Sequence, residues 1–133
     1  MPRISVFTDV LTDEESDYYV KKYTEVGMNP DAGLESREQT YGQITEEVEQ
    51  RSISWDTSPE DREFFKKRLA ETVGFPIENI EAGDIYRYQP GQYFGLHHDF
   101  PYTPKDIAYY ENGGDRKATG IFWLTDGYEG GAC

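Results

Sequence analysis

The hydrophobic pattern near the start of the chain predicts a short strand followed by a helix. Residues 4–7 form an apolar run typical of a strand. Thr12 and Glu15 have the spacing of a capping box, so a helix is expected to begin there, to run to about Glu25 and to end near Gly27. Its core face would carry the apolar side chains at helical spacing, which are Tyr19, Tyr23 and Val26.

A second helix is predicted in the middle of the chain. Ser58 is a typical N-cap residue, and Pro59 occupies the first helical position, where its missing N–H costs nothing. Gly74 is expected to end the helix in a left-handed conformation. One face of this helix carries apolar residues, which are Phe65, Leu69 and Val73.

After Gly83 the pattern changes to a period of two, which predicts strands. A turn at Pro90–Gly91 separates the first two of these strands. A further short strand is expected earlier, around residues 53–55. The strands predicted after Gly83 are residues 84–88, 92–100 and 117–124. Because helices come first and strands follow, the sequence predicts an α+β fold in a single domain over residues 1–133.

Composition and charge limit the classes of partner. The 133 residues carry 13 basic and 26 acidic side chains, a net charge of −13, and 15% are aromatic. A surface this acidic repels phosphate, so nucleic acid is not expected as a partner and an anionic membrane is disfavoured. The single cysteine, Cys133, rules out a disulfide within the chain. No apolar run suggests a signal peptide or a membrane span, so we expect a cytoplasmic location without membrane attachment.

The only two histidines of the chain are adjacent, in the sequence His97-His98-Asp99. Side chains alternate faces along a strand, so His97 and Asp99 would point to one side and His98 to the other. An imidazole and a carboxylate on one face supply two corners of the two-His-one-carboxylate triad that binds Fe(II) in oxygenases. Taken alone this spacing is a weak indicator, because two polar residues on a strand face are usually surface residues.

Several short motifs occur along the chain in an order that is typical of one protein family. The main ones surround the histidines, at residues 79–81, 86–94, 97–100, 113–119 and 130–131; two more lie upstream, at residues 6–19 and 51–55. Together they resemble the prolyl 4-hydroxylase-like Fe(II)/2-oxoglutarate-dependent dioxygenases from about residue 4 to the end. The resemblance implies a double-stranded β-helix of the jelly-roll or cupin-like kind, with the N-terminal helices packed on one sheet. It also implies Fe(II) and 2-oxoglutarate as cofactors, and it leaves a requirement for ascorbate open.

The resemblance assigns roles to the cofactor-binding residues. His97 and Asp99 would bind Fe(II), and no catalytic residue is implied beyond these ligands. Tyr88 matches the tyrosine that reaches the 2-oxoglutarate carboxylate. Thr119, in the barrel strand, and Cys133, which stands where the family commonly has a threonine, are the other candidate cofactor contacts.

A second group of matching residues would line a peptide groove, and these are Glu81, Phe94 and Arg116. Other interpretations are open for some of these positions. Tyr88 and Phe94 would also suit an ordinary barrel core, and Arg116 would also suit a solvated charge at a strand end.

The ligand set is incomplete in this sequence, because no histidine follows His98. The second ligand histidine, the basic 2-oxoglutarate anchor and the late barrel strands are expected beyond Cys133. Three explanations are open: a fragment of a longer product, a homodimer that pairs exposed strand edges, or a non-catalytic relative. Gly130–Gly131 is typical of the start of a strand and favours the fragment. Neither Asp115 nor Glu129 has a spacing that marks it as a replacement ligand.

The leading functional hypothesis is a dioxygenase that hydroxylates a peptidyl proline or a related amino-acid side chain. This chain alone does not contain the complete set of iron ligands, so it is not expected to be fully active by itself. A small-molecule substrate is a further option, while the charge of −13 disfavours a nucleobase. The alternative is a non-catalytic binding or assembly domain on the same scaffold. Binding of metal and of 2-oxoglutarate distinguishes the enzyme from the assembly domain.

Overall fold

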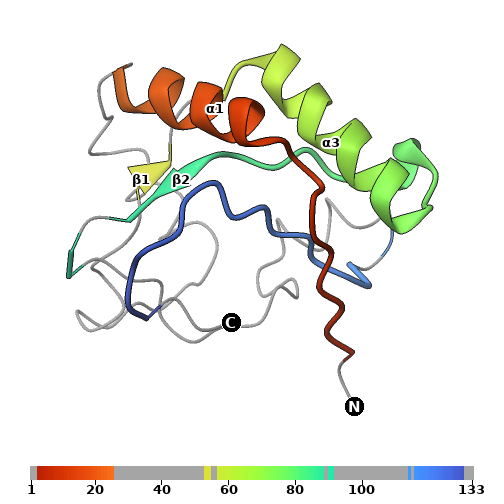
Figure 1. Cartoon of the computed structure of the whole chain (residues 1–133). Helices are drawn as coiled ribbons and strands as arrows, with labels where there is room; N and C mark the ends of the chain where they lie inside the picture. The colour runs from red at the N-terminus through yellow and green to blue at the C-terminus, as the bar shows by residue number, and fades with distance from the viewer. Residues whose placement is uncertain are drawn as a thin grey trace, which may run out of the picture.

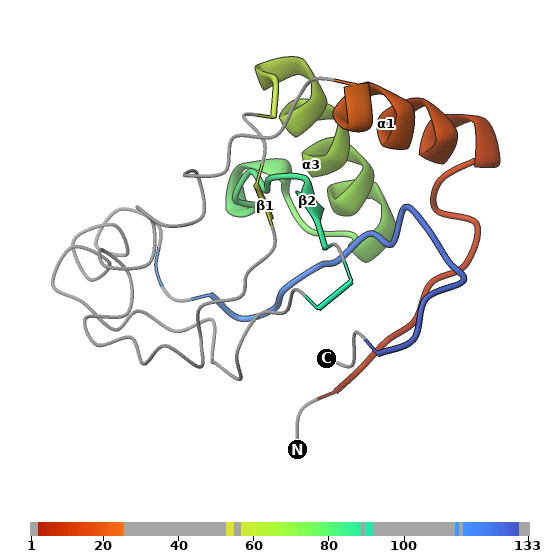
Figure 2. The ribbon, with the colours of Figure 1, turned by 90° about the vertical axis from the view of Figure 1, so that its left-hand side faces the viewer.

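The computed structural model describes residues 3–25, 53–54, 57–88, 90–91, 114 and 116–130. In chain order, its elements are α1 (Asp13–Glu25), β1 (Ile53–Ser54), α3 (Pro59–Val73), the 3-10 helix η2 (Ile77–Asn79) and β2 (Tyr86–Arg87). The two long helices form one layer, and β1, β2 and the extended residues 116–130 lie on one side of it (Figures 1 and 2). Among the described residues, neither long helix is apolar and long enough to cross a membrane.

The predicted capping box is present at the start of α1. The backbone N–H of Thr12 donates to Glu15 Oε2 at 2.9 Å, and the Glu15 N–H donates to Thr12 Oγ1 at 3.1 Å. Two N–H groups that the helix leaves without partners are thereby satisfied. The prediction of this helix is confirmed, and its end at Glu25 is the expected one.

The predicted ends of α3 are confirmed as well. Ser58 has an extended backbone, and its Oγ accepts a hydrogen bond from the Asp61 N–H at 3.3 Å. At the other end Gly74 has a φ of 73°, in the region that favours glycine, and its N–H donates to the Ala70 carbonyl at 2.9 Å.

Aromatic packing joins the two helices. Tyr19 and Tyr23 of α1 are buried, as predicted, and the Tyr19 ring centroid lies 4.7 Å from that of Phe65 on α3. Val26, the third residue predicted for this face, lies outside the described residues. The partly buried side chains that complete the cluster are Phe64, Phe65, Ile85 and Leu124.

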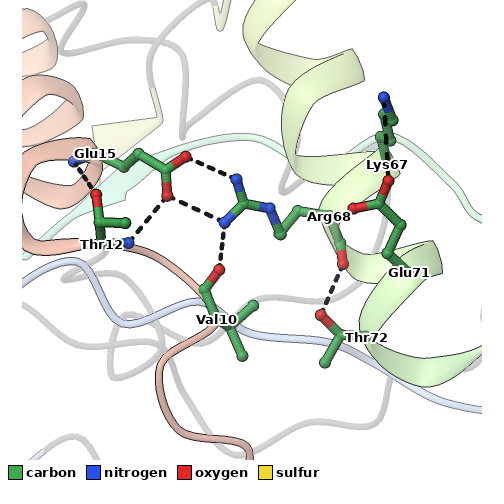
Figure 3. Close-up of polar contacts among 7 residues, drawn as sticks. All are labelled: Val10, Thr12, Glu15, Lys67, Arg68, Glu71 and Thr72. Carbon is green, nitrogen blue, oxygen red and sulfur yellow. Dashed lines mark hydrogen bonds and ion pairs between the residues drawn. The ribbon is translucent and has the colours of Figure 1, made fainter.

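Arg68 ties α3 to the beginning of α1 (Figure 3). Its guanidinium donates to Glu15 Oε1 at 2.7 Å and to Oε2 at 3.0 Å, and it also donates to the Val10 carbonyl. The hydrogen bond from Arg68, followed by that from the Thr12 backbone, holds the pKa of Glu15 below its ordinary value of 4.5. The capping residue of α1 is therefore also the attachment point of α3.

A second polar cluster joins the helices around Asp61, which is only 6% exposed. Its Oδ2 accepts hydrogen bonds from Lys22 Nζ at 2.6 Å and from the Tyr23 hydroxyl at 2.5 Å. The Tyr23 oxygen in turn accepts from the Ser58 N–H at 3.0 Å. Burial raises the pKa of Asp61, but hydrogen bonds from Lys22, Tyr23 and Ser58 outweigh it and hold the pKa below 3.8.

The lowered pKa values of Glu15 and Asp61 lead us to expect a loss of folding stability in acid. A group whose pKa is lower in the folded than in the unfolded chain contributes stability above its unfolded value, and this is lost as the pH falls through the folded value. Glu15 and Asp61 both belong to this class. We expect the thermal unfolding midpoint to decrease below about pH 4.5. An Asp61→Asn variant should show a shallower decrease, and a profile parallel to that of the wild type would contradict the assignment.

The strand predictions are confirmed only in part. β1 pairs antiparallel with β2, with Ile53 opposite Arg87 and Ser54 opposite Tyr86. β2 is shorter than the predicted strand over residues 84–88, and Trp55 of the other predicted strand lies outside the described residues. The predicted turn at Pro90–Gly91 is present, and Gly91 has a φ of 85°. The strand predicted over residues 92–100 lies outside the described residues.

Strand predictions for residues 4–7 and 117–124 are wrong for the structure described, which assigns neither segment to a strand. An extended run counts as a strand only when its backbone pairs with a neighbour, and no ladder joins either run to another described segment. The alternation predicted for residues 117–124 is nevertheless present. Phe122 and Leu124 pack toward the helices, whereas Ile121 and Trp123 are exposed.

Gly120 allows the extended segment to approach α3 closely. A Cβ atom at this position would lie 2.7 Å from Cδ1 of Leu69, closer than packed carbon atoms come. Gly120 therefore lies against Leu69, and Phe122 contacts Phe65 on the same helix, which places this segment beside α3. The short sheet does not test the double-stranded β-helix or the single domain, and both stay predictions.

Candidate functional site

The described residues include four of the eight predicted site residues. Tyr88 follows β2, and Glu81 precedes it by a short extended segment. Arg116 and Thr119 lie on the extended segment that runs beside the helices. The other four lie outside the described residues, namely Phe94, His97, Asp99 and Cys133.

Tyr88 lies on the side of β2 that faces away from the helix core. Ile85 packs against the Tyr19 and Tyr23 cluster, and strand geometry puts Tyr86 and Tyr88 on the opposite face. Arg87 is exposed as well. Tyr86 is exposed, and Tyr88 is 51% exposed. In the described structure the Tyr88 side chain is thus half exposed, and its phenol group is accessible to a small molecule. A position in the barrel core, the alternative interpretation of Tyr88, is not tested, because the barrel itself stays a prediction.

Glu81 and Arg116, two residues predicted for the peptide groove, form an ion pair although they are 35 positions apart. Arg116 Nε donates to Oε1 at 3.0 Å and to Oε2 at 3.1 Å, and Nη2 donates to Oε2 at 2.7 Å. The side chains are 43% and 39% exposed for Arg116 and Glu81. Arg116 is thus an exposed charge with an acidic partner, and the alternative interpretation of a solvated charge at a strand end stays open.

An exposed pair of this kind contributes little to folding stability. Its geometry is more informative, because several N–H groups meeting one carboxylate fix the orientation of the guanidinium plane. Both side chains are also partly exposed to solvent. The pair can therefore present an oriented donor and an oriented acceptor to a peptide backbone.

Three attachments hold the chain just before Tyr88. The β1–β2 ladder is one, and an ion pair at 2.6 Å between Arg62 Nη2 and Asp84 Oδ1 is the second. The third is a hydrogen bond of 2.9 Å from the Ile85 N–H to Thr57 Oγ1. Sequence reasoning missed Thr57, because a threonine next to a helix cap carries no mark of a contact 28 residues away.

No group of three His, Cys, Asp or Glu side chains that could hold a metal ion occurs within the described part of the chain. His97 and Asp99 are outside it, so their fit to iron rests on donor chemistry. A neutral imidazole and a carboxylate are suitable ligands for Fe(II), so the residue types fit part of a facial triad, and the site itself stays a prediction.

Comparison with known proteins gives one consistent set of relatives. The chain is 32% identical over 138 residues to prolyl 4-hydroxylase 1 of Arabidopsis thaliana, an alignment that covers 98% of this chain and 45% of that protein. Two further Arabidopsis thaliana proteins are prolyl 4-hydroxylase 5, at 29% identity, and probable prolyl 4-hydroxylase 10, at 30%. Each alignment again covers 98% of this chain, and they cover 43% and 44% of the relatives.

Other comparisons add no further family. No family model matches the chain, and no solved structure matches it. The chain spans less than half the length of the curated relatives it matches. The alignments nevertheless cover almost all residues of this chain, and all of the matched proteins are named prolyl 4-hydroxylase. The chain is therefore a relative of the prolyl 4-hydroxylases.

Proposed function

We propose that the chain acts in an Fe(II)- and 2-oxoglutarate-dependent dioxygenase that hydroxylates a peptidyl proline or a related amino-acid side chain. The observation that carries this proposal is the similarity to proteins named prolyl 4-hydroxylase over 98% of the chain. The accessible phenol of Tyr88 and the oriented pair of Glu81 and Arg116 support it. The fold we propose for this activity is the double-stranded β-helix.

In this proposal His97 and Asp99 hold the iron. The bound metal and 2-oxoglutarate supply the oxidising chemistry, while the protein binds the reactants, orients them and excludes water. His98, on the opposite strand face, is not a ligand. A site with two protein ligands is expected to bind the ion less tightly than a complete triad.

Among the residues that the structure describes, we propose that Tyr88 binds 2-oxoglutarate. A phenol O–H is a hydrogen-bond donor at neutral pH and can donate to a carboxylate. Its place on the exposed side of β2 suits a ligand that approaches from the side opposite the helices. Thr119 and the thiol of Cys133 are the further contacts that we propose for the same ligand.

Glu81, Arg116 and Phe94 are proposed to bind the peptide substrate. The Arg116 guanidinium can donate to a backbone carbonyl, and the Glu81 carboxylate can accept from a backbone N–H. Phe94 would contribute an apolar contact with a proline ring.

An Arg116→Gln variant tests this assignment. It removes the oriented cation, so we expect KM for a proline-containing peptide to increase about tenfold while KM for 2-oxoglutarate changes little. Steady-state kinetics with each substrate varied in turn measures both values. Arg3→Gln is the matched control, since Arg3 is exposed in the extended N-terminal segment. Equal KM values for the peptide in the two variants would contradict the assignment.

Succinate release tests the function as a whole. The full-length protein that contains this chain is incubated with Fe(II), 2-oxoglutarate and a proline-containing peptide, and we expect succinate release that the peptide stimulates. In the alternative of a non-catalytic assembly domain, no 2-oxoglutarate is consumed and a His97→Ala change leaves partner binding intact. Iron-dependent succinate release that is lost in His97→Ala distinguishes the enzyme from this alternative.

A further inference from the structure

Thr57 is a buried polar residue in the connection between β1 and α3. It is 5% exposed, and its Oγ1 accepts the Ile85 N–H at 2.9 Å. A backbone N–H that loses its acceptor in a partly buried place costs free energy, so this contact constrains both segments. Neither α1 nor the aromatic cluster supplies an equivalent bond to Ile85 among the contacts described.

The bond lies where the β1–β2 ladder would continue. The last ladder pair on this side is Ser54 with Tyr86, and Ile85 is the residue just before β2. The hydroxyl oxygen of Thr57, in the connection that follows β1, accepts the N–H of this residue. The oxygen is itself held in place, because the next residue, Ser58, donates its N–H to the Tyr23 hydroxyl at 3.0 Å.

The register of β2 decides which side Tyr88 occupies. With the observed register Ile85 packs into the core, while Tyr86 and Tyr88 are exposed. A slip by one residue would turn every side chain of the strand to the opposite face. A ladder of two residue pairs is too short to fix a register by itself, so additional bonds are required.

We propose that Thr57 is a positioning residue for Tyr88: its hydroxyl sets the register of β2 and so keeps the phenol on the side where 2-oxoglutarate binds. This inference rests on the proposed function for the ligand. Its structural part, the control of register, does not depend on that function. Thr57 does not touch the ligand in this arrangement and acts through β2.

Three variants test the role of the hydroxyl group. Thr57→Val keeps the side-chain shape and removes the acceptor, whereas Thr57→Ser restores it. Thr72→Val is the matched control: Thr72 is also partly buried, and its hydroxyl donates to the Arg68 carbonyl at 2.7 Å, within α3. Calorimetric titration with 2-oxoglutarate, in the presence of Fe(II) and without oxygen, measures Kd for each protein.

We expect Thr57→Val to raise Kd about fivefold, while Thr57→Ser and Thr72→Val stay within about twofold of the wild type. A purely structural role would move the unfolding midpoint without this selective effect on Kd. Equal Kd values for Thr57→Val and Thr72→Val would overturn the inference.

A second measurement separates this inference from the proposed function. If the wild-type protein does not bind 2-oxoglutarate, the proposed function fails, and NMR contacts of Tyr88 and Ile85 then decide the question of register. Faster exchange of the Ile85 amide and altered Tyr88 contacts in Thr57→Val, with neither change in Thr72→Val, would support the control of register. Unchanged signals in Thr57→Val would overturn it.

Discussion

Replacing His97 with alanine is expected to lower peptide-stimulated succinate release by more than about 100-fold. The change removes one of the two protein ligands that we propose for iron, and the remaining carboxylate of Asp99 cannot hold the ion in a defined geometry. Initial rates at saturating 2-oxoglutarate measure the loss. A parallel loss of bound iron is expected in the purified protein.

His98→Ala is the control for this experiment, because it removes the same type of side chain from the adjacent position. Side chains of neighbouring residues in a strand point to opposite faces, so the His98→Ala change is expected to leave iron binding largely intact. Equal losses in the two variants would mean that the strand is not oriented as proposed. A large loss in His98→Ala alone would exchange the roles of the two histidines.

Replacing Asp61 with alanine is expected to lower the free energy of unfolding by about 2–3 kcal/mol and the unfolding midpoint by roughly 10 °C. The buried carboxylate accepts hydrogen bonds from Lys22 and from the Tyr23 hydroxyl. Without it, a phenol in the core loses its acceptor and an ammonium group next to the core loses its counter-ion. Thermal and denaturant unfolding followed by circular dichroism measures the change.

Glu71→Ala provides the comparison on the same helix. Glu71 and Lys67 form an exposed pair with 4.0 Å between Nζ and Oε1, and such pairs add almost nothing to stability. We expect its unfolding midpoint to stay within about 2 °C of the wild type. If Asp61→Ala and Glu71→Ala unfold together, Asp61 does not hold α1 to α3.

The parts of the fold that could be predicted from the sequence are those that local chemistry decides. The capping box of Thr12 and Glu15 spans three residues, and Ser58 reaches only to Asp61. Gly74 ends α3 through its own backbone conformation. Each device works through atoms within one helical turn, so residue type and spacing are enough to place it.

Longer-range features could not be predicted in this way. The apolar pattern of residues 117–124 predicted a strand, but it carries no information about a pairing partner, and the structure assigns no strand there. The bond between Tyr23 and Asp61 joins residues 38 positions apart. Nothing in the type of either residue marks that contact before the helices are packed together.

In the candidate site, too, the residue types could be predicted from the sequence, whereas their long-range contacts could not. Family resemblance placed Glu81 and Arg116 in one groove, but their ion pair depends on how the extended segment approaches α3. Gly120 permits that approach, and the sequence pattern did not single it out. The exposure of Tyr88 likewise follows from the register of β2, which involves Thr57. His97 and Asp99 remain predictions from spacing and resemblance.

Calorimetric titration of the full-length protein that contains this chain with 2-oxoglutarate, with and without Fe(II) and in the absence of oxygen, tests the central claim most directly. The claim is that His97 and Asp99 hold an iron ion to which 2-oxoglutarate binds beside Tyr88. We expect binding that requires Fe(II) in the wild-type protein and that disappears in both His97→Ala and Asp99→Ala. Binding that persists without iron or in either variant, or no binding in the wild type, would contradict the claim.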